Sequence, residues 1–189
     1  MENSGEKNAI NYIYKYFISF KDLTIFDVGA NVGNYSKLLK ESFGEKATIY
    51  SFEPSKLTFQ RLKTNMGDKT KINLYNFGFG NNNTKVVLYS NSDESGLASV
   101  YKRRLNHFNI EMNKSEEIEI KLLDAFCDEK KIERIHFLKL DVEGHELEVL
   151  RGAPKMFNSG AIDFIQFEFG GCNIDSRTFF QDFYYLLKD

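Results

Sequence analysis

The sequence predicts an α/β protein with a doubly wound, mostly parallel sheet and helices on both faces. Short apolar runs rich in β-branched residues alternate along the chain with segments that repeat apolar residues at helical spacing. Such alternation is typical of parallel strands joined by right-handed crossovers. The chain has 189 residues, of which 42% are hydrophobic, which suits one domain with a sizeable core.

The first half of the chain alternates regularly between the two kinds of segment. Ile10, Ile13 and Phe17 recur at helical spacing, and Gly44 marks the end of a second helical stripe. The predicted elements are a helix over 6–19, a strand over 24–28, a helix over 35–43, a strand over 48–52, a helix opened by Pro54 and Ser55 with Leu62 and Met66 on its inner face, and a strand over 72–77.

The second half begins with an irregular stretch. Strands are predicted over 85–89 and 117–122, and the polar segment 91–115 between them is predicted to be a long loop or partial helix beside the site, of the kind that often forms a lid. The α/β rhythm then resumes with a strand over 135–140, a helix from 146 and a strand over 161–167. Ser176 is expected to cap a last helix that carries Phe180, Phe183, Tyr184 and Leu187 inward.

We therefore expect a single domain over 1–189. Its parts are an N-terminal helix (1–20), a cofactor-binding half (21–83), inserted strands and loop (84–134) and a C-terminal half (135–189). A doubly wound sheet normally continues by a strand or two at this point, so the C-terminal edge is expected to be truncated or left short. An exposed edge favours pairing with a second subunit, that is, a homodimer.

Composition and charge exclude several classes of protein. The net charge of −2 argues against a dedicated nucleic-acid binder, which would carry a positive excess. No window of 18 apolar residues is present, so no membrane span is expected, and the N-terminus shows no secretory signal. Cys127 and Cys172 form neither a disulfide framework nor a zinc spacing, which indicates buried thiols in a reducing, cytoplasmic setting.

A glycine loop follows the first predicted strand, in the run Asp27-Val28-Gly29-Ala30-Asn31-Val32-Gly33. Glycine suits a sharp turn that a ligand approaches closely. Glu53 follows the next strand, 20 residues after Gly33, where a carboxylate can accept hydrogen bonds from both ribose hydroxyls. Together these features predict an adenosine-containing ligand across the carboxyl ends of the strands.

The surrounding residues favour one adenosine ligand over another. The loop lacks the G-x-G-x-x-G pattern of dinucleotide sites and has no Lys or Arg to meet a phosphate. Asp27, Glu53 and Asp141 would instead make an acidic site, which suits a ligand with an amino group and a sulfonium. The prediction is therefore S-adenosylmethionine, with an NAD-linked oxidoreductase and a non-catalytic nucleoside-binding module as the alternatives.

A second motif places three ionisable groups at a strand tip. The strand Phe137–Leu140 delivers Asp141, and Glu143 and His145 follow on the turn into the next helix. Glu168 ends the strand of residues 164–169 on the same edge of the sheet, where a carboxylate among aromatic residues needs a partner. These carboxylates could hold a hard cation, but no ligand spacing demands it, so no metal is predicted.

The ordered set of motifs resembles the FkbM-type S-adenosylmethionine-dependent methyltransferases. The matching segments are 27–33, Phe52-Glu53-Pro54, Asn76 with 78–80, 95–100, 139–146 and 164–169, and they span most of the chain. The resemblance implies a Rossmann-like methyltransferase fold and O-methylation of a small-molecule or glycan acceptor, commonly a sugar of a glycan, lipopolysaccharide or glycosylated natural product. Members of this family often continue beyond a segment like residues 183–187, whereas this chain does not.

The resemblance also assigns roles to residues. The glycine loop would contact the methionine part of the cofactor, Glu53 the ribose, and the 78–80 loop the adenine, with Phe79 as a stacking wall. The full set of expected cofactor-binding residues is Asp27, Gly29, Ala30, Asn31, Gly33, Tyr35, Ser36, Glu53, Pro54, Gly78, Phe79, Asp141 and Glu143.

Methyl transfer to a sugar hydroxyl also needs a base, because a hydroxyl is a poor nucleophile. His145, Asp141 and Glu168 are the candidate catalytic residues, and we hypothesise that His145 or Glu168 is the base. His136, inside an apolar strand, is interpreted as a core or edge residue.

Overall fold

The computed structural model describes residues 5–67 and 69–188, so the start of the predicted 1–20 region lies outside the described residues. Its main sheet has five parallel strands in the order β3 (Ile72–Tyr75), β2 (Ala47–Phe52), β1 (Leu23–Val28), β7 (Ile135–Leu140) and β8 (Ile162–Phe167). The chain builds outward from β1 to β3 and then returns to the other side of β1. The doubly wound α/β fold is confirmed, and its switch point lies between β1 and β7.

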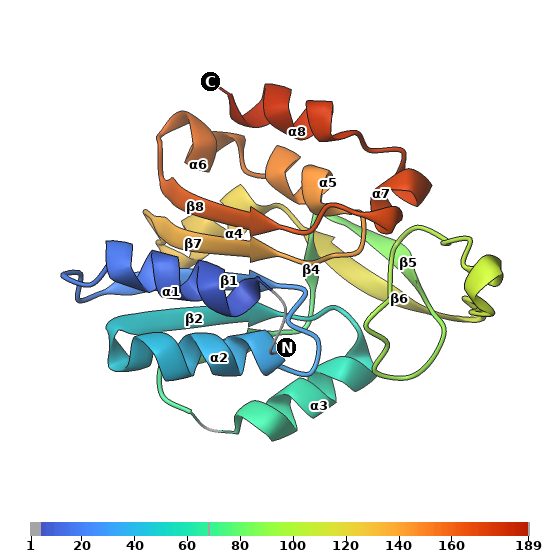
Figure 1. The fold of residues 1–189 in the computed structure, drawn as a ribbon, viewed down its shortest axis with the longest axis horizontal. Coiled ribbons are helices and arrows are strands. Elements are labelled where there is room, and N and C mark those ends of the chain that lie inside the picture. The colour runs from blue at the N-terminus through green and yellow to red at the C-terminus, as the bar shows by residue number, and fades with distance from the viewer. Residues whose placement is uncertain (1–4, 68, 189) are drawn as a thin grey trace.

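Helices cover both faces of this sheet. On one face, α1 (Glu6–Tyr16) and α2 (Asn34–Phe43) pack against residues such as Ile25 and Ile49, and α3 (Lys56–Met66) packs beside them against Ile72 and Leu74. On the other, α4 (Leu123–Lys130), α5 (Glu146–Arg151) and α6 (Pro154–Asn158) pack against Phe26 and Leu138. Figure 1 shows α1 and α2 in front of the sheet and α4 behind it. Side chains alternate between the faces of a strand, so neighbours such as Ile25 and Phe26 supply two separate cores.

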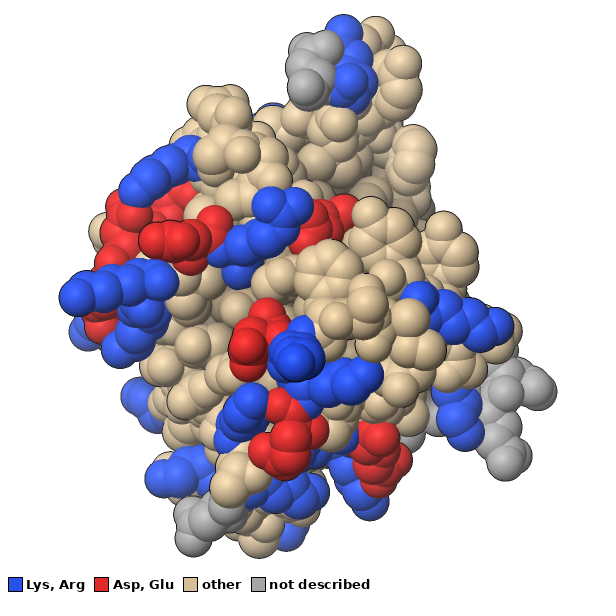
Figure 2. Space-filling view, turned by 90° about the vertical axis from the view of Figure 1, so that its left-hand side faces the viewer, with Lys and Arg blue, Asp and Glu red and all other residues tan. Residues whose placement is uncertain are grey.

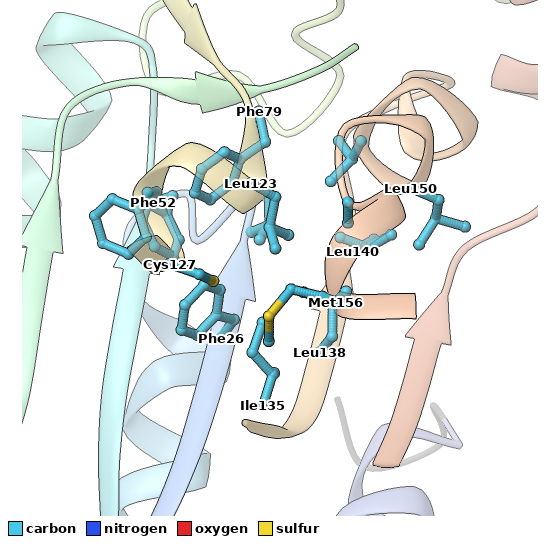
Figure 3. Close-up of a cluster of buried hydrophobic side chains, with 14 of the residues drawn as sticks. Phe26, Phe52, Phe79, Leu123, Cys127, Ile135, Leu138, Leu140, Leu150 and Met156 are labelled. Atoms are coloured by element: carbon cyan, nitrogen blue, oxygen red, sulfur yellow. The ribbon is translucent and has the colours of Figure 1, made fainter. Parts of the chain in front are cut away.

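Aromatic rings fill the second core. Phe26 and Phe52 from the sheet meet Phe79 and the Phe126 ring of α4, whose centroid lies 5.1 Å from that of Phe52. Figure 3 shows Phe26, Phe52 and Phe79 converging with Leu123, Cys127 and Met156. Both cysteines are free and buried. Helix α4 was not among the predicted elements, although it supplies part of this core.

A second, smaller sheet stands at the carboxyl ends of the main strands. Its order is β4 (Gly78–Phe79), β6 (Lys114–Lys121) and β5 (Thr84–Ser90), with β5 antiparallel to β6. The predicted strand over 72–77 is wrong in its extent, because the main sheet keeps only β3. The Asn76 amide donates to the carbonyls of Glu53 (2.9 Å) and Pro54 (3.0 Å), which turns the chain toward the second sheet.

The predicted C-terminal helix needs correction. Ser176 ends a short helix, α7 (Gly171–Ser176), and α8 (Phe180–Leu187) begins after Phe179, whose N–H donates to Asp182. Of the residues predicted to point inward, Phe183 alone is buried, and its ring stacks on Phe167 at 4.5 Å between centroids. Phe180, Tyr184 and Leu187 are exposed, because α8 packs closely on β8 through Phe183. The homodimer stays a prediction.

The face at the amino ends of the main strands carries both signs of charge interspersed (Figure 2). Near the strand starts, Arg134 pairs with Asp163 and Lys40 pairs with Glu45. Among the helices of residues 5–67 and 69–188, none has the length and apolar character that a membrane crossing requires.

Candidate functional site

A cavity of about 300 Å³ opens at the switch point, between the carboxyl ends of the main strands and the second sheet. That volume lies at the lower end of the range for small-molecule sites. Residues from both sheets, from the loops after the main strands, from the 91–113 loop and from the starts of α1 and α2 line it: Glu6, Val28, Gly29, Ala30, Asn31, Val32, Asn34, Tyr35, Glu53, Pro54, Gly78, Phe79, Leu88, Ser95, Gly96, Ala98, Val100, Ile118, Ile120, Lys139, Asp141, Val142, Glu143 and His145.

The glycine loop is packed against the tip of β7. Gly29 has φ +82°, and a Cβ there would lie 1.8 Å from the carbonyl oxygen of Asp141. The N–H groups of Gly29 and Ala30 both donate to the Phe52 carbonyl, at 3.0 and 2.9 Å. Only glycine meets both the dihedral and the steric demand, so the loop brings bare backbone to the cavity wall.

Glu53 closes the neighbouring side of the cavity. Its two carboxylate oxygens accept the N–H groups of Asn31 and Ser55, each at 2.9 Å, and 7% of the residue is exposed. Burial raises the pKa of Glu53 to about 7, although both N–H groups oppose the shift. Each oxygen keeps a free lone pair, so the group can accept further hydrogen bonds from a ligand.

Three of the predicted cofactor-binding residues lie beneath the cavity and do not line it. Asp27 is fully buried and accepts a hydrogen bond from Ser36 Oγ at 2.5 Å, while Gly33 faces Leu62 and Met66. The predicted acidic site also needs correction, because Lys139 Nζ lies 3.4 Å from Asp27 and 3.2 Å from Asp141. This buried lysine offsets part of the negative charge that was predicted for the site.

Asp141, Glu143 and Glu168 bring their carboxylates within 4.8 Å of one another at the β7 and β8 tips. Glu143 has φ +52° and is ion-paired with Arg103, which also lies 3.7 Å from Asp175. Burial raises the pKa of Glu143 to about 7 against the opposing effect of Arg103. Glu168 lies at the exposed edge of this group, outside the cavity lining, and burial together with Asp141 raises its pKa.

His145 lines the cavity where α5 begins. Its Nδ1 shares a hydrogen bond with the Tyr101 hydroxyl at 3.1 Å. Its Nε2 is packed on Gly80, where a Cβ would come within 2.9 Å of it. Burial lowers the pKa of His145, which favours the neutral imidazole. Both ring nitrogens are thus covered by neighbours.

The 91–113 loop does lie beside the site and is tied to it at several points. The Asn31 amide donates to the Ser95 carbonyl (3.1 Å), and Ser99 Oγ donates to the Glu143 carbonyl (2.7 Å). With Tyr101 on His145 and Arg103 on Glu143, the loop spans both sides of the cavity. Sequence spacing gave no sign of Tyr101 or Arg103, because their partners lie 44 and 40 residues away.

The parallel sheet, its switch point and the cavity at its carboxyl edge define a Rossmann-like α/β protein. Comparison with family models identifies the family within this fold class. The model described as the methyltransferase FkbM domain matches residues 27–188, and this chain belongs to the FkbM methyltransferase family.

Three distant curated relatives carry methyltransferase names. The chain is 27% identical over 174 residues to Methyltransferase 1 of Beauveria bassiana, covering 79% of this chain and 70% of that protein. It is 26% identical over 143 residues to 2-O-methyltransferase NoeI of Sinorhizobium fredii, covering 71% and 58%. It is 27% identical over 157 residues to hexuronic acid methyltransferase AglP of Haloferax volcanii, covering 82% and 59%. The matches thus span little more than half the length of these last two relatives.

Proposed function

We propose that this chain transfers a methyl group from S-adenosylmethionine to a hydroxyl of a sugar, in a glycan, a lipopolysaccharide or a glycosylated natural product. Family membership supports methyl transfer. The names of two relatives, a 2-O-methyltransferase and a hexuronic acid methyltransferase, support an oxygen of a sugar as the acceptor.

The observation that carries the proposal is the pairing of Gly29 with Glu53 across one cavity. Glu53, held by two N–H groups and almost fully buried, suits the two hydroxyls of a ribose. The apolar residues Ile118 and Ile120 offer a wall for an adenine. The prediction of Phe79 as a stacking wall is wrong, because its ring is buried against Phe52 and Phe126 in the aromatic core. Asp141, beside the bare backbone of Gly29, would face the amino-acid part of the donor. When bound, S-adenosylmethionine would supply an electrophilic methyl group.

The chain's own contribution to the reaction is alignment and proton removal. Holding the acceptor in line with the donor can lower the barrier by several kcal/mol, up to about 7–11 in ideal cases. We place the base at Glu168, because its pKa is raised by burial and by Asp141 and because its carboxylate is accessible. His145 is the second candidate, since Tyr101 and Gly80 cover its ring nitrogens.

Release of S-adenosylhomocysteine should be measured on a panel of neutral hexoses, 6-deoxyhexoses and hexuronic acids, with a phenol and a carboxylic acid as non-sugar controls. We expect turnover with a sugar, and Glu168→Gln should lower it by about 10²–10⁴-fold while cofactor affinity stays near that of the unmodified protein. His145→Gln is the matched comparison. Full turnover by Glu168→Gln together with lost turnover in His145→Gln would show that His145 is the base. Turnover on the phenol alone would refute the proposal that the acceptor is a sugar.

A further inference from the structure

A buried lysine in the wall of the cavity joins the tips of β1 and β7. Lys139 Nζ lies 3.4 Å from Asp27 Oδ1 and 3.2 Å from Asp141 Oδ2, and 6% of its side chain is exposed. Its ammonium also lies 4.8 Å from the centre of the Tyr35 ring. The β1–β7 register places Asp27 directly beside Lys139, so strand pairing itself fixes this contact.

The two carboxylates that contact this lysine differ in burial and in their other hydrogen bonds. Asp27 is fully buried and is also held by Ser36, whose hydroxyl contacts Ser51 at 2.7 Å. Asp141 lines the cavity with 34% of its side chain exposed. Within residues 5–67 and 69–188, Lys139 is the one cation within 4 Å of the Asp141 carboxylate.

Asp141 is surrounded by acids from several elements. Its carboxylate lies within 4.8 Å of those of Glu143 and Glu168, and Glu146 at the start of α5 interacts with it as a further negative charge. Like charges in a partly buried place disfavour the ionised form of each group. The lysine is the element that offsets them: burial opposes the shift, yet Asp27 and Asp141 raise the pKa of Lys139, so it stays cationic.

We propose that Lys139 is a positioning residue that holds the Asp141 carboxylate in one orientation beside a compensating positive charge, so that this carboxylate meets the α-amino group of the methyl donor. Lys139 itself contacts Oδ2 of this carboxylate, which lines the cavity. This inference rests on the proposed function and adds the residue that positions the carboxylate at the amino-acid end of the donor site.

The test compares two ligands that differ only at that end. S-Adenosylhomocysteine carries the amino-acid part, whereas 5′-methylthioadenosine has the same adenosine and sulfur without it. Calorimetric titration of Lys139→Met should show about a 10- to 100-fold loss of affinity for S-adenosylhomocysteine, the range expected for a charge-assisted hydrogen bond. Affinity for 5′-methylthioadenosine should stay unchanged. Lys40→Met, which alters another mostly buried lysine away from the cavity, should leave both affinities unchanged.

Lys139→Met leaves the buried Asp27 carboxylate without its cation, which can prevent folding. The double variant Asp27→Asn/Lys139→Met removes both charges, while the amide oxygen introduced at position 27 can still accept from Ser36, and it should show the same selective loss. Equal losses for both ligands, or no loss for either, in a folded variant would overturn the inference. Failure of the unmodified protein to bind either ligand would instead refute the proposed function.

Discussion

Two carboxylates follow neighbouring strand tips on either side of β1, and they are held in different ways. Glu53, after β2, receives two backbone N–H groups and is almost fully buried. Asp141, after β7, is partly exposed and its partner is the ammonium of Lys139. The first is arranged to accept uncharged donors such as hydroxyls, whereas the second forms an ion pair with a neighbouring cation. We call the part of the cavity around Glu53 its dipolar side. We call the part around Asp141 and Glu143, with their partners Lys139 and Arg103, its ionic side.

Gly29 lies between the two sides, because it packs on the Asp141 carbonyl and its N–H donates to the Phe52 carbonyl. Its substitution should therefore have the largest effect on the free energy of unfolding. Gly29→Ala places a Cβ 1.8 Å from the Asp141 carbonyl oxygen at φ +82°, and the expected loss is more than about 4 kcal/mol, or failure to fold. Gly160 also has a positive φ but has nothing within 4 Å, so Gly160→Ala should cost about 1–2 kcal/mol. Denaturant unfolding measures both, and equal losses would contradict the close approach of the two loops.

On the ionic side, removal of the cation from a buried ion pair should lower the free energy of unfolding, because it leaves the carboxylate unpaired. Arg103 and Glu143 have side chains 8% and 15% exposed, so Arg103→Met should lower the free energy of unfolding by about 3–5 kcal/mol at pH 8. The pKa of Glu143 is already raised to about 7. Below that pH its carboxyl becomes neutral and needs no cation, so the loss should shrink at pH 6.

Lys102, the exposed residue next to Arg103, provides the matched control for Arg103→Met. Lys102→Met should leave stability unchanged at both pH values, and Arg103→Met/Glu143→Gln should recover much of the loss. A penalty for Arg103→Met that is the same at pH 6 and pH 8 would show that lost packing, not the unpaired Glu143 carboxylate, causes the effect.

On the dipolar side, the effect should appear as pH dependence. Ribose hydroxyls bind the ionised form of Glu53, whose pKa is raised to about 7. Affinity for S-adenosylhomocysteine should therefore fall about tenfold per unit as pH drops below 7. Glu53→Gln should weaken binding about 10- to 100-fold at pH 8 and abolish this slope. Calorimetry from pH 5.5 to 8.5 tests both, and a slope retained in Glu53→Gln would assign it to another group.

For the protein without ligand, the raised pKa of Glu53 gives stability the opposite pH dependence to that of ligand affinity. A carboxyl whose folded-state pKa is raised from 4.5 to about 7 binds its proton more tightly when folded. Its contribution to stability is present below pH 4.5 and is lost as pH rises through 7. Glu53→Gln should flatten this part of the stability profile, which thermal unfolding across the same range measures.

The sequence allowed the dipolar side to be predicted far better than the ionic side. Gly29 and Glu53 follow directly from strand ends, and their positions in a parallel sheet are fixed by local pattern. Asp141 was found by the same reasoning. Tyr101, Arg103 and Lys139 were not, because their roles depend on contacts with side chains from other elements. The break after β3 was also missed, since it depends on the Asn76 amide reaching two distant carbonyls.

The central claim is that the cavity between Gly29 and Glu53 takes the nucleoside of a sulfonium methyl donor. Parallel calorimetric titrations of the unmodified protein with S-adenosylhomocysteine and with NAD test it most directly. The account predicts that S-adenosylhomocysteine binds, one molecule per chain, and that NAD gives no binding heat. Binding of NAD without binding of S-adenosylhomocysteine would contradict it.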